Sequence, residues 1–146
     1  MGNFSKFMVL IWVMVFCTTA YSQKGMGESD GLASQKAIPD FVTLKGTVQE
    51  IKRGPCTFTV GKSISGTHLL IKSDEAVFNV HLGPTTKIYN FVSDSKDSEV
   101  EVTVFRTKKL PNNHYIAKEL VYNKDTLMLR DGYLKPFWAN RKGKEL

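Results

Sequence analysis

From Phe41 onward the chain is a succession of short runs in which apolar and polar residues alternate, and turn residues separate one run from the next. The clearest run is Glu99–Arg106, which reads Glu-Val-Glu-Val-Thr-Val-Phe-Arg. Alternation with a period of two residues is typical of β-strands, whereas a major helix needs a longer stretch with a period of three to four. The sequence therefore predicts an all-β protein with six strands near Phe41–Arg53, Gly66–Lys72, Ala76–Leu82, Glu99–Arg106, Tyr115–Tyr122 and Thr126–Arg130.

Strands this short bury enough apolar surface only if their sheet closes on itself. The first run contains Gly46, and its alternation slips at Ile51, which predicts a bend and a bulge in a strand that serves both sides of a barrel. The stretch Thr85–Ser98 is the one place for a short helix. We therefore expect a small OB-like Greek-key barrel of five to six strands with one short helix, in the order β-β-β-α-β-β. A β-sandwich is the alternative.

The first 22 residues have the pattern of a secretory signal peptide. Lys6 precedes the apolar run Phe7–Cys17, and small residues follow, with a cleavage position after Ser22. The run is shorter than a membrane-spanning helix, although an uncleaved anchor is the alternative. We expect export to the periplasm or the medium, a flexible linker over residues 23–40, the barrel over 41–138 and a basic C-terminal tail over 139–146. Contact with a membrane is expected only through the signal peptide before cleavage.

A resemblance to known proteins covers roughly Phe41 to Trp138. It lies in a series of short motifs whose order is more specific than any one of them: LKGTV from Leu44, HLLI from His68, VHLGP from Val80, VEVT from Val100, AKEL from Ala117 and LRDG from Leu129. In this series the chain resembles a family of small exported, mostly uncharacterised bacterial OB-fold proteins, and it is similar to the wider periplasmic bacterial OB-fold group. The chain departs from that family where Val104-Phe105-Arg106 stands in place of a glycine. The resemblance implies binding or envelope-stress roles and supplies no catalytic residues.

The most specific constellation is a pair of histidines. If the chain turns at Asp74-Glu75, His68 faces His81 across a hairpin, on the face opposite to the core. Two imidazoles at that spacing can share a metal ion, but a third ligand is needed, and His114 or an acidic residue would supply it only through the fold. The alternative is a pair of ordinary surface residues or a hydrogen-bonded pair.

The mature chain would keep one cysteine, because Cys17 leaves with the leader. Cys56 is interpreted as a small buried hydrophobic residue; a reactive thiol or an intermolecular disulfide is the alternative.

A second candidate site is a basic groove across the second and third strands and the loop that follows the fourth. On an OB-like barrel this region borders the usual binding face, and aromatic rings there can stack on a ligand. The residues predicted to bind are Lys72, Asn79, Phe105, Arg106, Lys108, Lys109 and Tyr115. The expected partner is an anionic envelope polymer, an oligosaccharide or a protein, since export disfavours nucleic acid. Solvated loop charges are the alternative interpretation.

The sequence contains no glycine-rich phosphate loop, no His-Glu-x-x-His, no Cys-x-x-Cys and no nucleophile elbow. We therefore expect neither an enzyme nor a cofactor. Three hypotheses follow: an exported binding module of the groove type, a metal-binding or metal-sensing protein that uses His68 and His81, and a structural or assembly protein that uses an open sheet edge.

Overall fold

The computed structural model describes residues 38–56, 64–74, 76–108 and 110–139. The predicted signal peptide lies outside these residues, as do most of the predicted linker and all of the basic tail except Ala139. The elements follow the predicted order: β1 (Val42–Gly54), β2 (Gly66–Lys72), β3 (Val77–Pro84), α2 (Thr85–Val92), β4 (Glu99–Phe105), β5 (His114–Tyr122), β6 (Asp125–Met128) and the 3-10 turn η2 (Phe137–Ala139). The all-β class, the six strands and the short α-helix between the third and fourth strands are confirmed. No helix in the described ranges has the length and apolar character needed to cross a bilayer.

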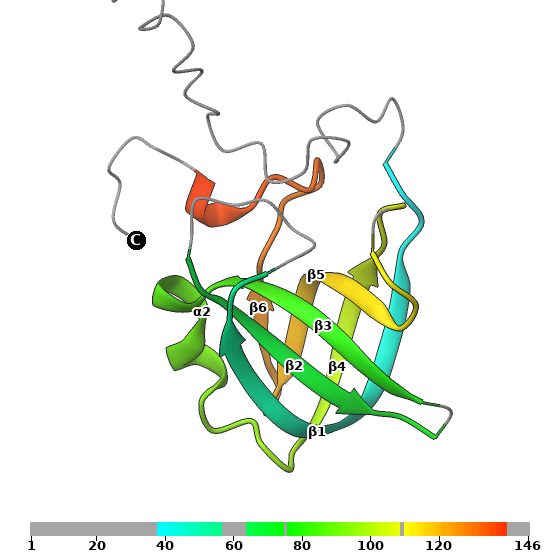
Figure 1. The fold of residues 1–146 in the computed structure, drawn as a ribbon, viewed down its shortest axis with the longest axis vertical. Coiled ribbons are helices and arrows are strands. Elements are labelled where there is room, and N and C mark those ends of the chain that lie inside the picture. The colour runs from blue at the N-terminus through cyan, green and yellow to red at the C-terminus, as the bar shows by residue number, and fades with distance from the viewer. Residues whose placement is uncertain (1–37, 57–63, 75, 109, 140–146) are drawn as a thin grey trace, which may run out of the picture.

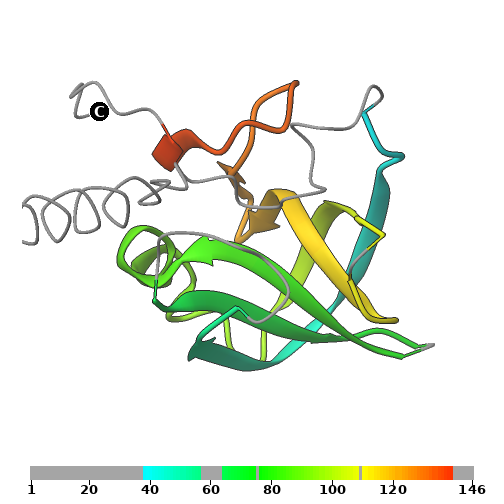
Figure 2. The same ribbon diagram turned by 45° about the horizontal axis from the view of Figure 1, so that its top comes forward.

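The six strands form a single sheet that curls into a barrel-like ring. Their order is β3-β2-β1-β4-β5-β6, and a parallel pairing of β3 with β5 closes the ring (Figure 1). All other pairings are antiparallel. Seen from a second direction, α2 lies at one end of the ring (Figure 2), where Ile88 and Val92 are fully buried.

The first strand serves both sides of the ring, as its sequence predicts. Residues before Thr47 pair with β4, and residues after it pair with β2. Gly46 stands just before this change of partner, where any side chain would overlap the carbonyl oxygen of Lys72. The predicted bulge is present between Val48 and Glu50. The glycine and the bulge together let one strand bend far enough to join two parts of the sheet.

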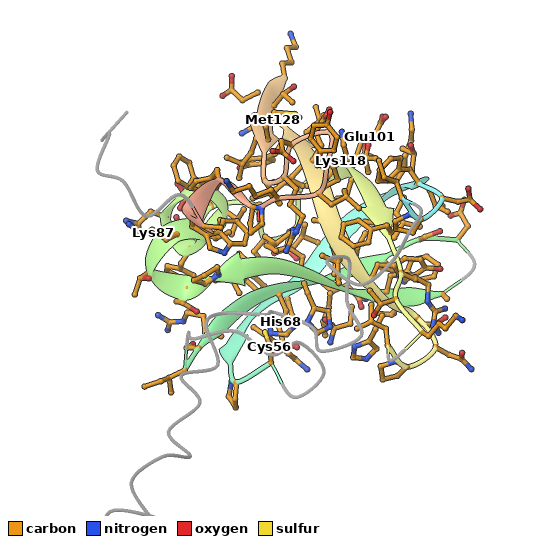
Figure 3. The ribbon with its side chains drawn as sticks, turned by 90° about the horizontal axis from the view of Figure 1, so that it is seen from above. Cys56, His68, Lys87, Glu101, Lys118 and Met128 are labelled. Carbon is orange, nitrogen blue, oxygen red and sulfur yellow. The ribbon has the colours of Figure 1, made fainter. Side chains whose placement is uncertain are left out.

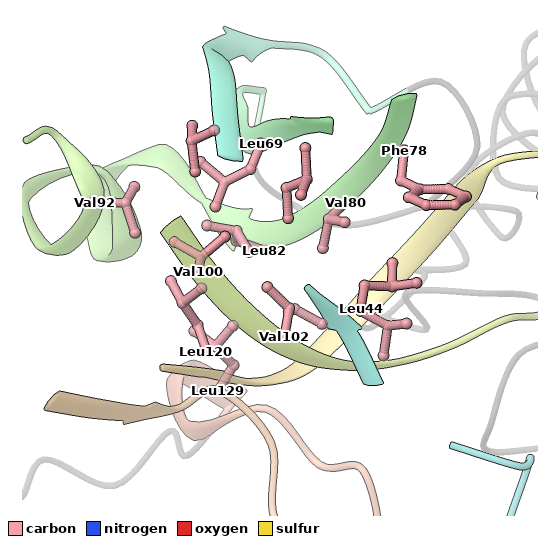
Figure 4. Packing of buried hydrophobic residues seen from close by; sticks show 14 of the residues in the cluster. Leu44, Leu69, Phe78, Val80, Leu82, Val92, Val100, Val102, Leu120 and Leu129 are labelled. Carbon is pink, nitrogen blue, oxygen red and sulfur yellow. The ribbon is translucent and has the colours of Figure 1, made fainter. Parts of the chain in front are cut away.

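The apolar core fills the ring (Figure 4). The β2–β3 hairpin has the predicted register, in which Leu69 faces Val80 and Ile71 faces Phe78. These four side chains point inward and are buried. Because side chains alternate along a strand, this register sends the intervening residues of the hairpin to the outer face.

Part of the outer face is itself covered. Phe105, Leu110, Ile116 and Leu134 form a second, smaller buried cluster. The last described segment also packs closely on β3, since a side chain at Gly83 would overlap the ring of Trp138. One end of the outer face is therefore shielded from water.

Candidate metal centre

The site begins with the pairing of strands on the outer face. His68 of β2 lies directly opposite His81 of β3 on one side and Lys52 of β1 on the other. In the next row Asn79 pairs with His114 of β5 across the parallel contact. Directly paired residues share a face of the sheet, so the three histidines and Asn79 gather on one patch. The predicted opposition of His68 and His81 is confirmed, and their ring centroids are 4.3 Å apart.

The two hairpin histidines are buried, with 8% of His68 and 4% of His81 exposed. The interpretation as ordinary surface residues is therefore wrong. Strand alternation correctly identifies the outer face, but it does not reveal that other segments cover that face here.

Cys56 contributes the third donor. It lies two residues beyond the end of β1, and its Sγ is 3.1 Å from Nε2 of His68 (Figure 3). The approach depends on Gly66, which pairs with Gly54 at the start of β2, because a side chain at position 66 would overlap the sulfur. Cys56 is half-buried, so it is less deeply enclosed than the sequence interpretation expects, and its neighbour is an imidazole.

One donor atom each from Cys56, His68 and His81 lies within 4.8 Å of the other two. Thiolate sulfur and imidazole nitrogen are the ligands that zinc, copper and related ions prefer. Each bond from such an ion to sulfur or nitrogen is about 2.0–2.3 Å long, so donors at this spacing can surround one ion after small side-chain adjustments.

Hydrogen bonds orient both imidazoles. Nδ1 of His68 is 3.2 Å from Oδ1 of Asn79. Since an amide oxygen only accepts, Nδ1 carries the proton, and the lone pair is on Nε2, the atom beside the Cys56 sulfur. A second-shell acceptor of this kind is a regular feature of histidines that bind metal ions.

His81 is held by His114, with 3.1 Å between its Nε2 and Nδ1 of His114. Its other nitrogen, Nδ1, is the single buried polar side-chain atom of the described residues that has no hydrogen-bond partner. Buried polar atoms are rarely left without a partner, and a bound ion is one of the accepted reasons.

The histidines are held in their neutral, ligand-ready form. Burial lowers the pKa of His81 to about 3, with further contributions from His68, His114 and Arg130. Burial also lowers the pKa of His68, a shift that the hydrogen bond to Asn79 partly opposes and that His114 and Lys52 reinforce.

The pKa of His114 is lowered for the same reason, first by burial and then by Arg106. None of the three imidazoles therefore has to lose a proton at neutral pH before it binds a metal ion.

A pocket of about 220 Å³ adjoins the donor atoms. It is lined by Lys52, Arg53, Gly54, Pro55, His68, Asn79, His81 and His114. The pocket gives the histidines a route to solvent, and its described lining residues include no acidic side chain.

The residues predicted for a basic groove do not form one continuous surface. Asn79 belongs to the histidine patch, where it bonds His68. Phe105 is fully buried in the second cluster, so its ring has no exposed face for a ligand to stack on. Leu110 and Leu134 cover it, and both come from segments that strand alternation does not take into account.

Of the remaining groove residues, Arg106 and Tyr115 contact each other. The Arg106 guanidinium donates to the carbonyls of Leu110 and Pro111 and stacks on Tyr115, whose ring also packs on Phe78. Lys72 and Lys108 are exposed, and Lys109 lies outside the described residues. Two members of this set are thus occupied in holding the loop and the sheet together.

The sequence did not predict Cys56 as a donor, and it offered His114 only as a third ligand that the fold would have to bring to the pair. Both come from segments distant from the hairpin in the sequence, so the register of β2 and β3 gives no indication of them. One signal was present: Gly66 stands two residues before His68, and a glycine inside a strand often marks a close approach of another group.

Comparison with curated proteins and with solved structures gave no match. The OB-fold group therefore stays a resemblance in sequence motifs. A family model does match residues 40–127, from the start of β1 to the third residue of β6 and thus across the whole sheet apart from the last residue of that strand. This match extends over more than half of the chain, and the protein belongs to the MamS/MamX magnetosome protein family.

Proposed function

We propose that this protein is an exported, non-catalytic metal-binding protein that holds one transition-metal ion between Cys56, His68 and His81. Its family is named for magnetosomes, and we extend that setting to this chain as part of the proposal. The observation that carries the proposal is the convergence of one sulfur and two imidazole donors within 4.8 Å.

Two further features support binding over a purely structural role. A bound ion would give the buried Nδ1 of His81 the partner that it otherwise lacks. The hydrogen bonds that His68 makes to Asn79 and His81 makes with His114 also fix the two rings, so little conformational entropy would be lost when an ion binds.

The groove hypothesis has weaker support in this geometry. Phe105 is buried, and Arg106 already donates to two backbone carbonyls. Binding of an anionic polymer or a protein partner across Lys72 and Lys108 stays a prediction from the sequence.

The test is metal content after equilibration. The purified protein would be dialysed anaerobically, with reductant, against equal concentrations of Zn²⁺, Co²⁺ and Cu(I), and bound metal would be measured by mass spectrometry. We expect one equivalent of metal per chain. Cys56→Ala, His68→Ala and His81→Ala should each lose most of it.

Met128→Ala is the control and should keep its metal, because it removes an exposed sulfur-bearing side chain of β6 that lies away from Cys56 and His68 (Figure 3). Circular dichroism would establish that each variant keeps its β-sheet spectrum. Retention of metal by the three folded site variants, or less than a tenth of an equivalent in the unaltered protein, would overturn the proposal.

A further inference from the structure

The charges around the three donor atoms discriminate between kinds of metal ion. Lys52 lies opposite His68 in the strand register, and its positive charge helps to lower the pKa of that histidine. The charge of Arg130 helps to lower the pKa of His81, and the Arg130 guanidinium donates to the backbone carbonyl of the neighbouring Leu82. The charge of Arg106 likewise helps to lower the pKa of His114. Each histidine of the patch therefore has a cationic side chain near it.

Negative charge is scarce in the same region. Among the described residues, none that lines the pocket is acidic. Glu50 lies 3.6 Å from Lys52, but both side chains are about half exposed, at 54% and 50%. Glu50 therefore offsets part of the Lys52 charge, and solvent screens the remainder, so Lys52 adds a modest positive potential at the histidines. Among the donor atoms themselves, the Cys56 sulfur is the one that becomes anionic when it binds a metal.

This arrangement favours an ion with a single positive charge. One thiolate fully neutralises a monovalent ion, whereas a divalent ion with the same ligands keeps a net positive charge. That charge would be enclosed beside two buried imidazoles and close to Lys52 and Arg130. Enclosing uncompensated charge of the same sign as its surroundings is unfavourable.

The type and number of donor atoms also favour a monovalent copper ion. Soft thiolate ligands select Cu(I) and zinc among the common ions. Structural zinc sites take four protein ligands and catalytic ones take three with a water, so zinc held by the three donors of this cluster would need a water as its fourth ligand. His114 does not complete a set of four through Nδ1, since that atom is engaged with His81. Cu(I), by contrast, is stable with few ligands.

Building on the proposed function, we infer that this site selects cuprous ion, Cu(I), over Zn²⁺ and other divalent ions. The selection comes from one thiolate among cationic neighbours in a site with three donors. It concerns binding alone, with copper supplied already in the cuprous state.

The inference is tested by anaerobic competition on the full-length protein. Affinity for Cu(I) would be measured against a chromophoric cuprous chelator, and affinity for Zn²⁺ against a chromophoric zinc chelator, in the same buffer with reductant. We expect Cu(I) to displace Zn²⁺ from the protein when both are present in equal amounts. The three site variants described above should lose both affinities.

Two charge-reversal variants test whether the positive charge near His68 affects metal selectivity. Lys52→Glu places a carboxylate opposite His68. Lys87→Glu makes the same change at an exposed position of α2, away from Cys56 and His68 (Figure 3). Lys52→Glu should lower the ratio of Cu(I) to Zn²⁺ affinity by roughly tenfold, the order expected for two units of charge at this range in a partly screened site. Lys87→Glu should leave the ratio unchanged.

The outcomes separate the two proposals. Absence of any bound metal overturns both. Stoichiometric binding with Zn²⁺ retained against equal Cu(I), or an equal ratio in Lys52→Glu and Lys87→Glu, overturns the cuprous inference and leaves the metal centre intact. Since Lys52 is half exposed, its replacement does not disturb the core, and a thermal melt of each variant checks this directly.

Discussion

His81 has an unusual environment for a titratable side chain. It is almost completely buried, one of its nitrogens has no hydrogen-bond partner, and burial lowers its pKa from 6.5 to about 3. In the unfolded chain the same imidazole takes up a proton near its ordinary pKa. The folded and unfolded states therefore bind different numbers of protons between these two values.

We expect the metal-free protein to lose stability as the pH falls below 6.5. Over that range the unfolded state binds the extra proton, so the free energy of unfolding rises with pH and falls with acid. Between pH 7.5 and pH 5 the loss from His81 alone is about 2 kcal/mol, because the slope approaches about 1.4 kcal/mol per pH unit only below the unfolded pKa. Urea unfolding at pH 7.5 and pH 5.0 measures it.

His81→Gln is the control for this prediction, because glutamine keeps a polar side chain but does not titrate. Its pH dependence should be shallower than that of the unaltered protein. Equal stability of the unaltered protein at the two pH values would contradict the assigned protonation state.

Asn79 acts on the site through another residue. Its side-chain oxygen accepts from Nδ1 of His68 and so directs the lone pair of Nε2 toward the Cys56 sulfur. Asn79→Ala should weaken metal binding by about 10- to 100-fold, the usual effect of removing a second-shell partner, without changing the stoichiometry. Val77→Ala alters an exposed position two residues away on the same face of β3 and should leave the affinity unchanged. Equal affinities in the two variants, measured by chelator competition, would exclude the positioning role.

At the level of elements, the first strand and the second meet at a pair of glycines. Gly54 and Gly66 are paired, but a side chain at Gly66 would overlap the Cys56 sulfur, while a side chain at Gly54 would meet nothing within 4 Å. Gly66→Ala should therefore displace the thiol and reduce metal affinity at least tenfold, a loss of about 1.4 kcal/mol. Gly54→Ala makes the identical chemical change one strand away and should retain full affinity. Titration of both variants with Co²⁺, followed through the thiolate absorption band, compares them directly.

The hairpin is the element that the sequence predicts best. Its apolar alternation fixes which residues face the core, and the turn that follows Ser73 fixes which residues stand opposite each other. The opposition of His68 and His81 follows from these two local facts. Cys56 was not predicted as a ligand because the bend that Gly46 and the bulge indicate does not specify which residues the end of β1 approaches.

Burial on the outer face of the sheet depends on how the whole chain packs. Alternation in β4 correctly predicts which of its side chains enter the core, yet Phe105 is buried on the opposite face. Its cover comes from Leu110 and Leu134, which are brought there by the closure of the ring and the return of the C-terminal segment. Burial on an outer face is a property of the assembled chain, so the groove residues could not be sorted into exposed and enclosed from the sequence.

Metal binding should also raise the stability of the whole protein. The donors come from β2, β3 and the segment after β1, so they converge only in the folded state. An ion present at 100 times its dissociation constant adds about 2.7 kcal/mol to the free energy of unfolding. Thermal melts with the bound metal and with excess chelator measure this difference. Cys56→Ala should melt at one temperature under both conditions, and a comparable metal-dependent rise in that variant would place the stabilising ion elsewhere.

The two faces of the β2–β3 hairpin have a consequence for the evolution of the family. Leu69, Ile71, Phe78 and Val80 belong to the core, whereas Cys56, His68 and His81 stand outside it. The proposed metal site requires only three outward positions, so its gain or loss in a relative would require no change in the core. In an alignment of family members we expect these three positions to change together, independently of the inward four. A relative that lacks one of the three donors should show relaxed constraint at the other two and at the glycine beside the sulfur.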